Sequence, residues 1–241
     1  KKIGLFLVAL IFTLGVKGQV NLQDGLIAYY PFNGNAKDHS VYRTNLANSN
    51  SVDYVKGYKK RAASFNSSNF LISGHLPEIF STSMGTISFW IKINSNTGKS
   101  NSCFAITDAN ELKSFLFYFD QRPTTTEQRI GIFITGSNYQ WSYQFNETTF
   151  NSISNLNWHL YTITQDGTQA KFYIDGSQIN PSTSTNTNPG AWISFVQPAK
   201  MYIGYKKYTD NGLNGLIDEV RIYNRVLNDH EIQTLFNGFH H

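Results

Sequence analysis

The stretch Thr86-Ile-Ser-Phe-Trp-Ile-Lys-Ile93 alternates between apolar and polar side chains. Successive side chains of a β-strand point to opposite faces, so the three isoleucines share one face with Phe89, and Trp90 lies on the polar face. This pattern predicts an antiparallel strand with one face on a core and the other toward solvent. The apolar face needs a second layer to cover it, which favours a two-layer β-structure.

Comparable runs recur through most of the chain and are separated by Gly, Asn, Ser and Asp. The Asp166-Gly167 pair between two of them favours a tight hairpin, since Asp-Gly tolerates the positive φ angles of primed turns. So many half-buried strands predict an all-β domain, a jelly-roll β-sandwich of two antiparallel sheets. The predicted strands cover residues 25–32, 62–65, 70–73, 86–93, 102–107, 114–119, 129–135, 139–145, 158–165, 170–174, 200–204 and 215–223.

A short helix is predicted at the C-terminal end. Asn228 can cap it, and Glu231 stands three residues later, as in a capping box. Apolar side chains then recur at helical spacing and predict a face that packs on the sandwich; they are Ile232, Leu235 and Phe236. The segment 182–189 is rich in Ser, Thr and Asn, and we interpret it as a solvated loop.

The N-terminal residues have the pattern of a secretory signal peptide. Lys1 and Lys2 precede an apolar run over residues 3–16, and Gly18 offers a small residue for cleavage. We predict a signal peptide over residues 1–18 and one β-sandwich domain over 19–241. The domain is then secreted or otherwise extracytoplasmic, at the cell surface or in the periplasm. The alternative is an uncleaved N-terminal anchor, although the run is short of the roughly 20 residues that cross a membrane. No transmembrane segment is predicted after the cleavage point.

Charge and cysteine usage exclude several classes of partner. Loss of Lys1, Lys2 and Lys17 lowers the formal charge of +4 by three, to +1. So small a charge predicts no large basic face, which argues against nucleic acid and against recruitment to an anionic membrane. Cys103 is the single cysteine, so no intrachain disulfide can form, and its strand-like context predicts a buried, inert thiol.

Four stretches together resemble the laminin G-like jelly rolls of the concanavalin A-like lectin and glucanase superfamily. They are GLIAYYPFNGNAKD at 25–38, TISFWIK at 86–92, WHLYTI to YIDG at 158–176, and GLIDEVRIYNR at 215–225. The resemblance spans residues 25 to about 238 and implies a β-sandwich. It decides little about function, because this fold carries lectins, adhesins, appended binding modules and hydrolases alike.

The residue patterns of catalysis are missing from the sequence. Sugar-cleaving relatives carry Glu-x-Asp-x-x-Glu on one strand, which sets two carboxyl groups on either side of the scissile bond. That motif is absent, the histidines lack metal-ligand spacing, and no Gly-x-Ser-x-Gly motif occurs. The sequence therefore predicts a protein that is not an enzyme. The alternative is a dispersed site, such as a lyase that uses His159 and Tyr161; the competing interpretation has both packing beside Trp158.

A cation site is predicted around Asp218. Strand alternation puts this carboxylate on the face of Leu216, Val220 and Ile222, where an unpaired charge is costly. We expect it to be buried and close to the loop 33–38.

The family resemblance implies a structural Ca²⁺ between the first and last strands. It carries over Asp218 and Asp38 as ligands, with Asn33 and Gly34 in support. Such a loop offers backbone and side-chain oxygens, of which Ca²⁺ takes about six to eight. Alternatively, Asp218 accepts backbone N–H bonds and Asp38 closes a turn.

Aromatic residues make up 15% of the chain, and two sets adjoin polar side chains. An exposed ring beside amides and hydroxyls suits a sugar, because the ring supplies area and the polar groups supply orientation. The alternative is that the rings face the core and their polar neighbours face water. We predict a ligand-binding face formed by Tyr139, Trp141, Tyr143, Trp90 and Arg129.

Three function hypotheses follow from these observations. The first is a secreted, non-catalytic carbohydrate-binding module, lectin-like, with a glycan as its partner. The second is an interaction or adhesion subunit that docks on a cell-surface or outer-membrane protein. The third is a glycan-processing enzyme with a dispersed site.

Overall fold

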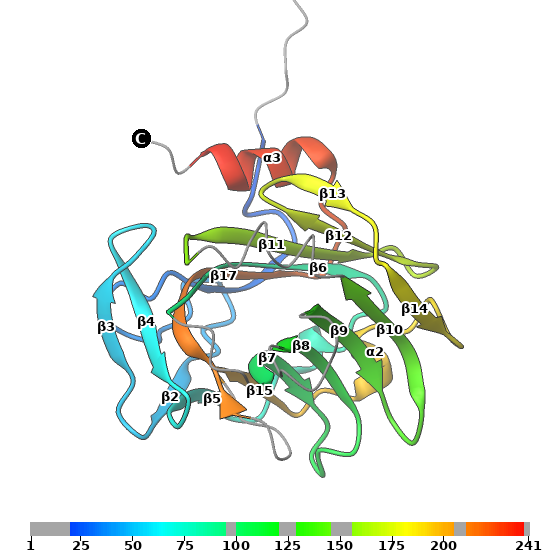
Figure 1. Ribbon diagram of the computed structural model, residues 1–241, viewed down its shortest axis with the longest axis horizontal. Coiled ribbons are helices and arrows are strands. Elements are labelled where there is room, and N and C mark those ends of the chain that lie inside the picture. The colour runs from blue at the N-terminus through cyan, green and yellow to red at the C-terminus, as the bar shows by residue number, and fades with distance from the viewer. Residues whose placement is uncertain (1–19, 95–99, 121–128, 146–155, 205–210, 239–241) are drawn as a thin grey trace, which may run out of the picture.

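The computed structural model describes residues 20–94, 100–120, 129–145, 156–204 and 211–238. Two β-sheets lie face to face and make up most of the molecule, which confirms the predicted sandwich (Figure 1). Sheet A has eight strands and sheet B has nine. Neighbouring strands in the described ranges are antiparallel except for one short parallel pair in sheet B.

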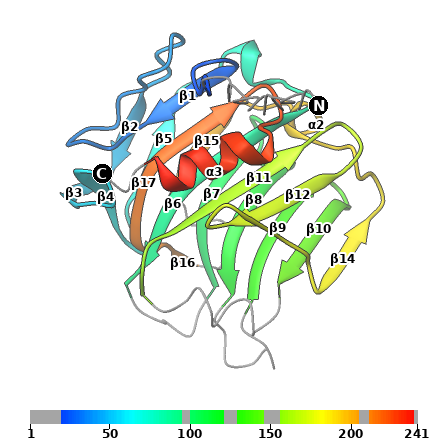
Figure 2. The ribbon, with the colours of Figure 1, turned by 90° about the horizontal axis from the view of Figure 1, so that it is seen from above.

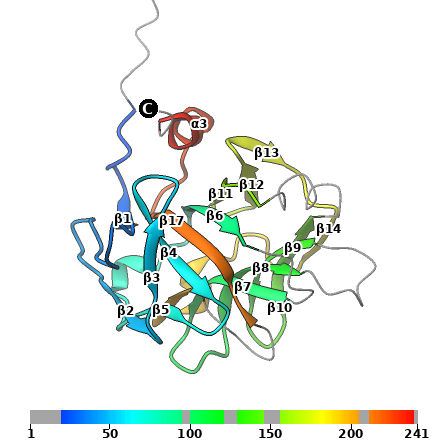
Figure 3. The same cartoon turned by 60° about the vertical axis from the view of Figure 1, so that its left-hand side comes forward.

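Sheet A contains the first and last strands of the chain. Its strand β1 (Leu26–Tyr30) pairs with β17, beside the main path (Figure 3). From edge to edge the order is β13 (Ser177–Ile179), β12 (Ala170–Ile174), β11 (His159–Gln165), β6 (Gly85–Ile93), β17 (Asn214–Tyr223), β4 (Arg61–Asn66) and β3 (Asp53–Lys56).

Sheet B contains most of the central strands. Its short strand β16 (Asn211–Gly212) is the one that pairs in parallel, with β7. From edge to edge the order is β14 (Thr183–Asn186), β10 (Tyr139–Phe145), β9 (Arg129–Thr135), β8 (Ser114–Asp120), β7 (Ser100–Thr107), β15 (Lys200–Ile203), β5 (Phe70–Ser73) and β2 (Leu46–Ser49).

The main core fills the space between the two sheets. The isoleucines of β6 and Phe89 point into it, as the alternation of that strand predicts. Phe89 stacks on Phe104 across the sandwich, with ring centroids 5.9 Å apart. Cys103 is fully buried in the same core, and burial raises the pKa of its thiol. The predicted burial of this cysteine is therefore confirmed. Short helical segments, α2 (Ile193–Val196) and a 3₁₀ turn η1 (Glu78–Phe80), add apolar side chains to the core.

The C-terminal helix α3 (Asp229–Asn237) lies across the outer face of sheet A (Figure 2). Asn228 and Glu231 form the predicted capping box. Ile232 and Leu235 pack on outward-facing side chains of the sheet, in a second apolar cluster that includes Trp90 and Leu160. Sheet A is therefore buried on both faces where the helix covers it.

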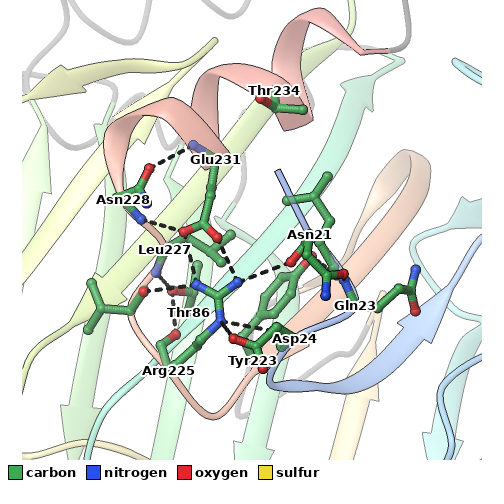
Figure 4. A network of polar contacts seen from close by, with 12 residues as sticks. Asn21, Gln23, Asp24, Thr86, Tyr223, Arg225, Leu227, Asn228, Glu231 and Thr234 are labelled. Carbon is green, nitrogen blue, oxygen red and sulfur yellow. Dashed lines mark hydrogen bonds and ion pairs between the residues drawn. The ribbon is translucent and has the colours of Figure 1, made fainter. Parts of the chain in front are cut away.

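Arg225 joins the N-terminal segment to this helix (Figure 4). Its terminal nitrogens donate to the two carboxylate oxygens of Glu231, at 2.7 and 2.9 Å. The same guanidinium donates to the backbone carbonyls of Asn21 and Asp24. Because guanidinium and carboxylate planes match in this two-point geometry, the pair fixes α3 and residues 21–24 against the end of β17.

Two predictions about local structure were wrong. The segment 182–189 was expected to be a loop, but residues 183–186 form β14, a fully exposed edge strand paired with β10. A strand that buries neither face has no apolar periodicity, so the pattern could not reveal it. In β17, a bulge between Asp218 and Arg221 shifts the alternation, and Glu219 has a positive φ of 53°. Asp218 therefore does not share a face with Val220 and Ile222, which point into the core.

The predicted signal peptide, residues 1–18, lies outside the described residues. Among the helices in the described ranges, none is both long and apolar enough to cross a membrane.

Candidate functional site

Trp141 and Tyr143, two predicted ligand-binding residues, lie in the core between the sheets. Trp141 is fully buried and its Nε1 donates to the carbonyl of Ala191 at 2.7 Å. The expectation that these rings form an exposed face was wrong. Their polar neighbours, such as Ser142 and Gln144, take the outer face of β10 instead. Alternation separates the two faces of a strand, but it does not say which face meets the other sheet.

Trp90 lies on the outer face of sheet A, as predicted, but it is not exposed. The ring of Tyr58 stacks on it at 3.5 Å, and Phe236 of α3 stacks at 5.8 Å. Only 1% of its surface is accessible. The expectation of an exposed Trp90 was wrong because α3 and the β3–β4 turn cover this part of the sheet. The side chains of Tyr139 and Arg129 lie outside the described residues, although their backbones belong to β10 and β9.

An unpredicted row of apolar side chains crosses the outer face of sheet B. Backbone register places Ile72, Tyr202, Leu116 and Phe133 in this row, on β5, β15, β8 and β9, with Ala105 of β7 in the middle. Together with Phe70 and Tyr118 they form a cluster separate from the main core. We name these six larger side chains the sheet B strip; its members are Phe70, Ile72, Leu116, Tyr118, Phe133 and Tyr202.

Tyr118 has the most unusual environment in the sheet B strip. It pairs across the strands with Gly131, and a Cβ atom at residue 131 would overlap the atoms of the tyrosine ring. The ring therefore lies directly over the glycine backbone, and Phe133 contacts it edge to face with centroids 5.8 Å apart. Phe70, Ile72 and Tyr118 are half-buried, whereas Tyr202 and Leu116 are buried.

Polar groups continue the same row and border it. Past Phe133, the register runs on to Ser142 of β10 and Thr185 of β14. Glu111, on the β7–β8 turn, accepts a 2.6 Å hydrogen bond from the hydroxyl of Tyr202. Ser102, the cross-strand neighbour of Tyr118, has a buried hydroxyl with no hydrogen-bond partner among the described residues. The face thus combines flat apolar area with hydroxyl, amide and carboxylate groups.

The sequence carried a signal for this strip. In residues 114–119 apolar side chains occupy both faces, with Phe115 and Phe117 in the core and Leu116 and Tyr118 outside. An antiparallel strand with one solvated face alternates. Apolar positions on both faces therefore indicate a second buried or binding surface.

Asp38 holds the loop after β1 together. Its Oδ1 accepts from the backbone N–H groups of Tyr29 and Ser40, and its Oδ2 accepts from the Ser40 hydroxyl and the Thr44 N–H, all within 2.9 Å. A carboxylate offers about four lone-pair positions. These four bonds use them all, which corresponds to the turn-closing alternative.

Asp218 is fully buried, as predicted, and it faces the β3–β4 turn. Its Oδ2 accepts from the N–H of Lys59 at 2.9 Å, and its Oδ1 accepts from the N–H of Glu219 at 2.8 Å. Burial raises the pKa of this carboxyl to about 7; the neighbouring Glu219 adds to the shift and the backbone donors oppose it. Asn33 accepts from the N–H of Arg61, the first residue of β4, so Asn33 and Asp218 both contact the β3–β4 hairpin.

These contacts bear on the predicted calcium site. Asp38 and Asp218 are surrounded by N–H and O–H donors, which direct hydrogens rather than oxygens toward them. Gly34 has a positive φ of 91° and open space around it. In the described ranges, no three His, Cys, Asp or Glu side chains gather as a metal-binding group. The donor set in this arrangement does not fit Ca²⁺, and calcium binding stays a prediction.

The two residues of the enzyme alternative lie in different environments. Tyr161 is buried in the main core against Phe117 and Phe119, and burial raises the pKa of its hydroxyl well above the ordinary value. His159 pairs through Nδ1 with Asp175 at 2.7 Å. The arrangement orients an imidazole, but it places the Tyr161 ring among core side chains.

A buried ionic group at the β17 bulge was missed. Glu219 is 1% exposed; it accepts from the hydroxyl of Tyr29 and pairs with Arg221 at 2.6 Å. The guanidinium of Arg221 also lies 4.1 Å from the centre of the Tyr29 ring. This group links β1 to β17, so its contacts are those of a structural clamp.

Solved structures share the sandwich. Domain 4 of AbnA, a GH43 extracellular arabinanase from Geobacillus stearothermophilus, solved with arabinotriose, is 20% identical with a TM-score of 0.63, over 88% of this chain and 98% of that one. The receptor-binding domain of botulinum neurotoxin mosaic serotype C/D is 18% identical with a TM-score of 0.69, over 90% of this chain and 52% of that one. The binding domain of Paraclostridial Mosquitocidal Protein 1 is 22% identical with a TM-score of 0.64, over 91% and 53%. The chain thus spans about half the length of the two toxin-type domains, and these similarities show the fold.

Among curated proteins, none matches this chain. A family model does match, over residues 65–233, and these residues include the strands that carry the sheet B strip. The chain therefore belongs to the concanavalin A-like lectin/glucanases superfamily.

Proposed function

We propose that this protein is a non-catalytic carbohydrate-binding module, and that its site is the sheet B strip. The observation that carries the proposal is the placement of Tyr118 over Gly131. A ring held over the glycine backbone offers a platform for the apolar face of a sugar. Glycine at residue 131 is what allows this position.

The extent of the row favours an oligosaccharide over a single sugar. From Ile72 to Phe133 it crosses five strands, a distance of about 19 Å at roughly 4.8 Å between neighbours. The hydroxyl groups of Ser142 and Thr185 then continue the row on β10 and β14. Apolar area along the middle and polar groups at the borders are what recognition of a neutral glycan chain requires.

The solved structures that share the fold also support a binding role. The arabinanase domain was solved in complex with arabinotriose, and the toxin-type relatives are receptor-binding or binding domains. These are other proteins with the same fold. They favour a binding role outside the cytoplasm for this chain as well, which fits the secretory signal expected from the sequence.

The test is calorimetric titration with arabinotriose and a panel of neutral oligosaccharides. We expect Tyr118→Ala to weaken binding about tenfold, or ~1.4 kcal/mol, the scale of one aromatic contact. Tyr42→Ala is the matched control, because Tyr42 is an exposed tyrosine on a loop of the β1–β2 connection. Binding should change little between about 50 and 500 mM salt, because a neutral ligand is not screened. Unchanged affinity in Tyr118→Ala, or no binding across the panel, would overturn the proposal.

The protein-docking hypothesis is favoured by one separate feature. In the loop 38–44 the polar side chains Asp38, Ser40 and Thr44 are buried, while Val41 is 84% exposed and Tyr42 is 42% exposed. The hydrogen bonds of Asp38 hold this apolar tip rigid, and a preorganised apolar tip suits a protein partner. Crosslinking in native envelopes should capture one defined protein with the wild type and lose it with Val41→Asp. Retention of the same crosslink in Val41→Asp would exclude the loop as the contact.

The non-catalytic assignment has its own assay. Incubation with the same polysaccharides should release no reducing ends and no unsaturated products. If product does form and His159→Ala abolishes it without loss of folding, the glycan-processing hypothesis replaces the binding module.

A further inference from the structure

A cleft of about 250 Å³ lies on the outer face of sheet A, away from the sheet B strip. One wall is the β11–β12 hairpin, and the other is the segment 226–229 that leads into α3. Figure 2 shows the helix beginning beside these two strands. The cleft belongs to neither the sheet B strip nor the Asp218 region.

The floor of the cleft is made of side chains that are almost fully buried by their neighbours. Tyr173 and Leu227 are 5% and 1% exposed, and Thr164 beside them is 2% exposed. The hydroxyl of Tyr173 donates to Asp229 Oδ1 at 3.1 Å. Burial, with Asp229 adding to it, raises the pKa of this phenol to about 12, so the hydroxyl keeps its proton and remains a donor at neutral pH.

The walls of the cleft carry carboxylates that each have one oxygen without a hydrogen bond. Asp166 Oδ1 accepts from the N–H and hydroxyl of Thr168 and from the N–H of Gln169, which fixes this carboxylate in its turn. In the described part of the chain, Oδ2 of Asp166 and Oδ2 of Asp229 accept no hydrogen bond. Hydrogen bonds from Thr168 and Gln169 lower the pKa of the Asp166 carboxyl, and Lys171 lies near enough for its positive charge to help lower it further. The carboxylates of Asp166 and Asp229 and the ammonium of Lys171 therefore border the same cleft.

This combination selects a class of ligand. Two carboxylates against one ammonium leave the cleft slightly negative, which disfavours anions. A large apolar ligand would leave the charged walls without partners. A polyhydroxylated ring satisfies both conditions, because its hydroxyls donate to the carboxylates and accept from Lys171 while its C–H face covers the accessible edge of Tyr173.

We propose that this α3 cleft is a second ligand site, which binds one pyranose unit between Lys171 and Asp229. The α3 cleft is separate from the sheet B strip, so an experiment can exclude ligand binding at one of them without excluding it at the other. A protein with both sites would hold a glycan at two places on opposite outer faces of the sandwich.

The test is nuclear magnetic resonance titration of ¹⁵N-labelled protein with the methyl glycosides of glucose, galactose, mannose and N-acetylglucosamine. We expect at least one sugar to shift the backbone amides of Thr164, Tyr173 and Asn228 in a saturable way. Lys171→Ala should weaken that response at least fivefold. Lys37→Ala, an exposed lysine in a different loop, is the matched control and should leave it unchanged.

Two further outcomes keep the inference separate from the proposed function. Tyr118→Ala should leave the cleft response intact while it weakens oligosaccharide binding to the sheet B strip. The cleft assignment is overturned if none of the four glycosides shifts these amides up to the solubility limit. It is also overturned if Lys171→Ala and Asp229→Asn, both shown to be folded by their spectra, respond as the wild type does.

Discussion

The ring of Tyr118 lies over the backbone of Gly131, its cross-strand partner, and fills the space that a side chain there would occupy. Gly131→Ala should therefore lift the ring from the sheet and weaken oligosaccharide binding about as much as Tyr118→Ala does, with both variants folded. Calorimetric titration of the two variants measures this. Gly136→Ala is the control, because a Cβ there would meet its neighbours at 3.5 Å or more, an ordinary contact distance. Full affinity in Gly131→Ala would show that the position of Tyr118 over the glycine does not matter for binding.

Trp141 should behave as a core residue. It is fully buried, and Trp→Ala in a core typically costs about 3 to 5 kcal/mol of unfolding free energy through lost contacts and the cavity left behind. Ser142→Ala, on the outward side of the same strand, should cost well under about 1 kcal/mol. Urea unfolding of both variants separates the two expectations. A Trp141→Ala variant of wild-type stability with impaired glycan binding would restore the surface role that the sequence predicted.

Asp38 offers a test of both its loop role and the calcium prediction. Asp38→Ala leaves three backbone N–H groups and the Ser40 hydroxyl without their acceptor, so we expect a loss of about 3 kcal/mol in unfolding free energy. Because hydrogen bonds occupy all its lone pairs, EDTA should leave the melting temperature of the wild type unchanged. A melting temperature that falls with EDTA and recovers with added Ca²⁺ would establish the metal site and contradict the donor-set argument.

Asp218 should make stability depend on pH. Its folded pKa of about 7 exceeds the ordinary value of 3.8, so between these values the folded state holds a proton that the unfolded state has lost. The contribution is therefore fully present below about pH 4 and is lost as pH rises toward 7, at up to about 1.4 kcal/mol per pH unit. Asp218→Asn cannot titrate. Urea unfolding from pH 4.5 to 7.5 should show the wild type losing stability relative to this variant; a constant difference would contradict the raised pKa.

Much of the fold was predictable because it depends on local periodicity. Alternation places β9, β10 and β12 at the residues where the structure has them, and the Asn228 and Glu231 pattern predicts the start of α3. In a strand with one buried face, and in a capped helix, the spacing of apolar and polar residues along the chain indicates which positions are buried. The exposed edge strand β14 buries no face, and so it left no such pattern.

The sequence alone determined the all-β class, the closing helix and the buried cysteine, because each depends on residue types at short spacing. Only the tertiary structure decided which face of each strand meets water. Trp141 and Tyr118 lie on neighbouring regions of one sheet, yet one ring faces the core and the other faces outward. Helix α3 covers Trp90, and a bulge moves Asp218 off the face of Val220. These outcomes depend on contacts between segments far apart in the chain, and a period of two is the same whichever side the second layer lies on.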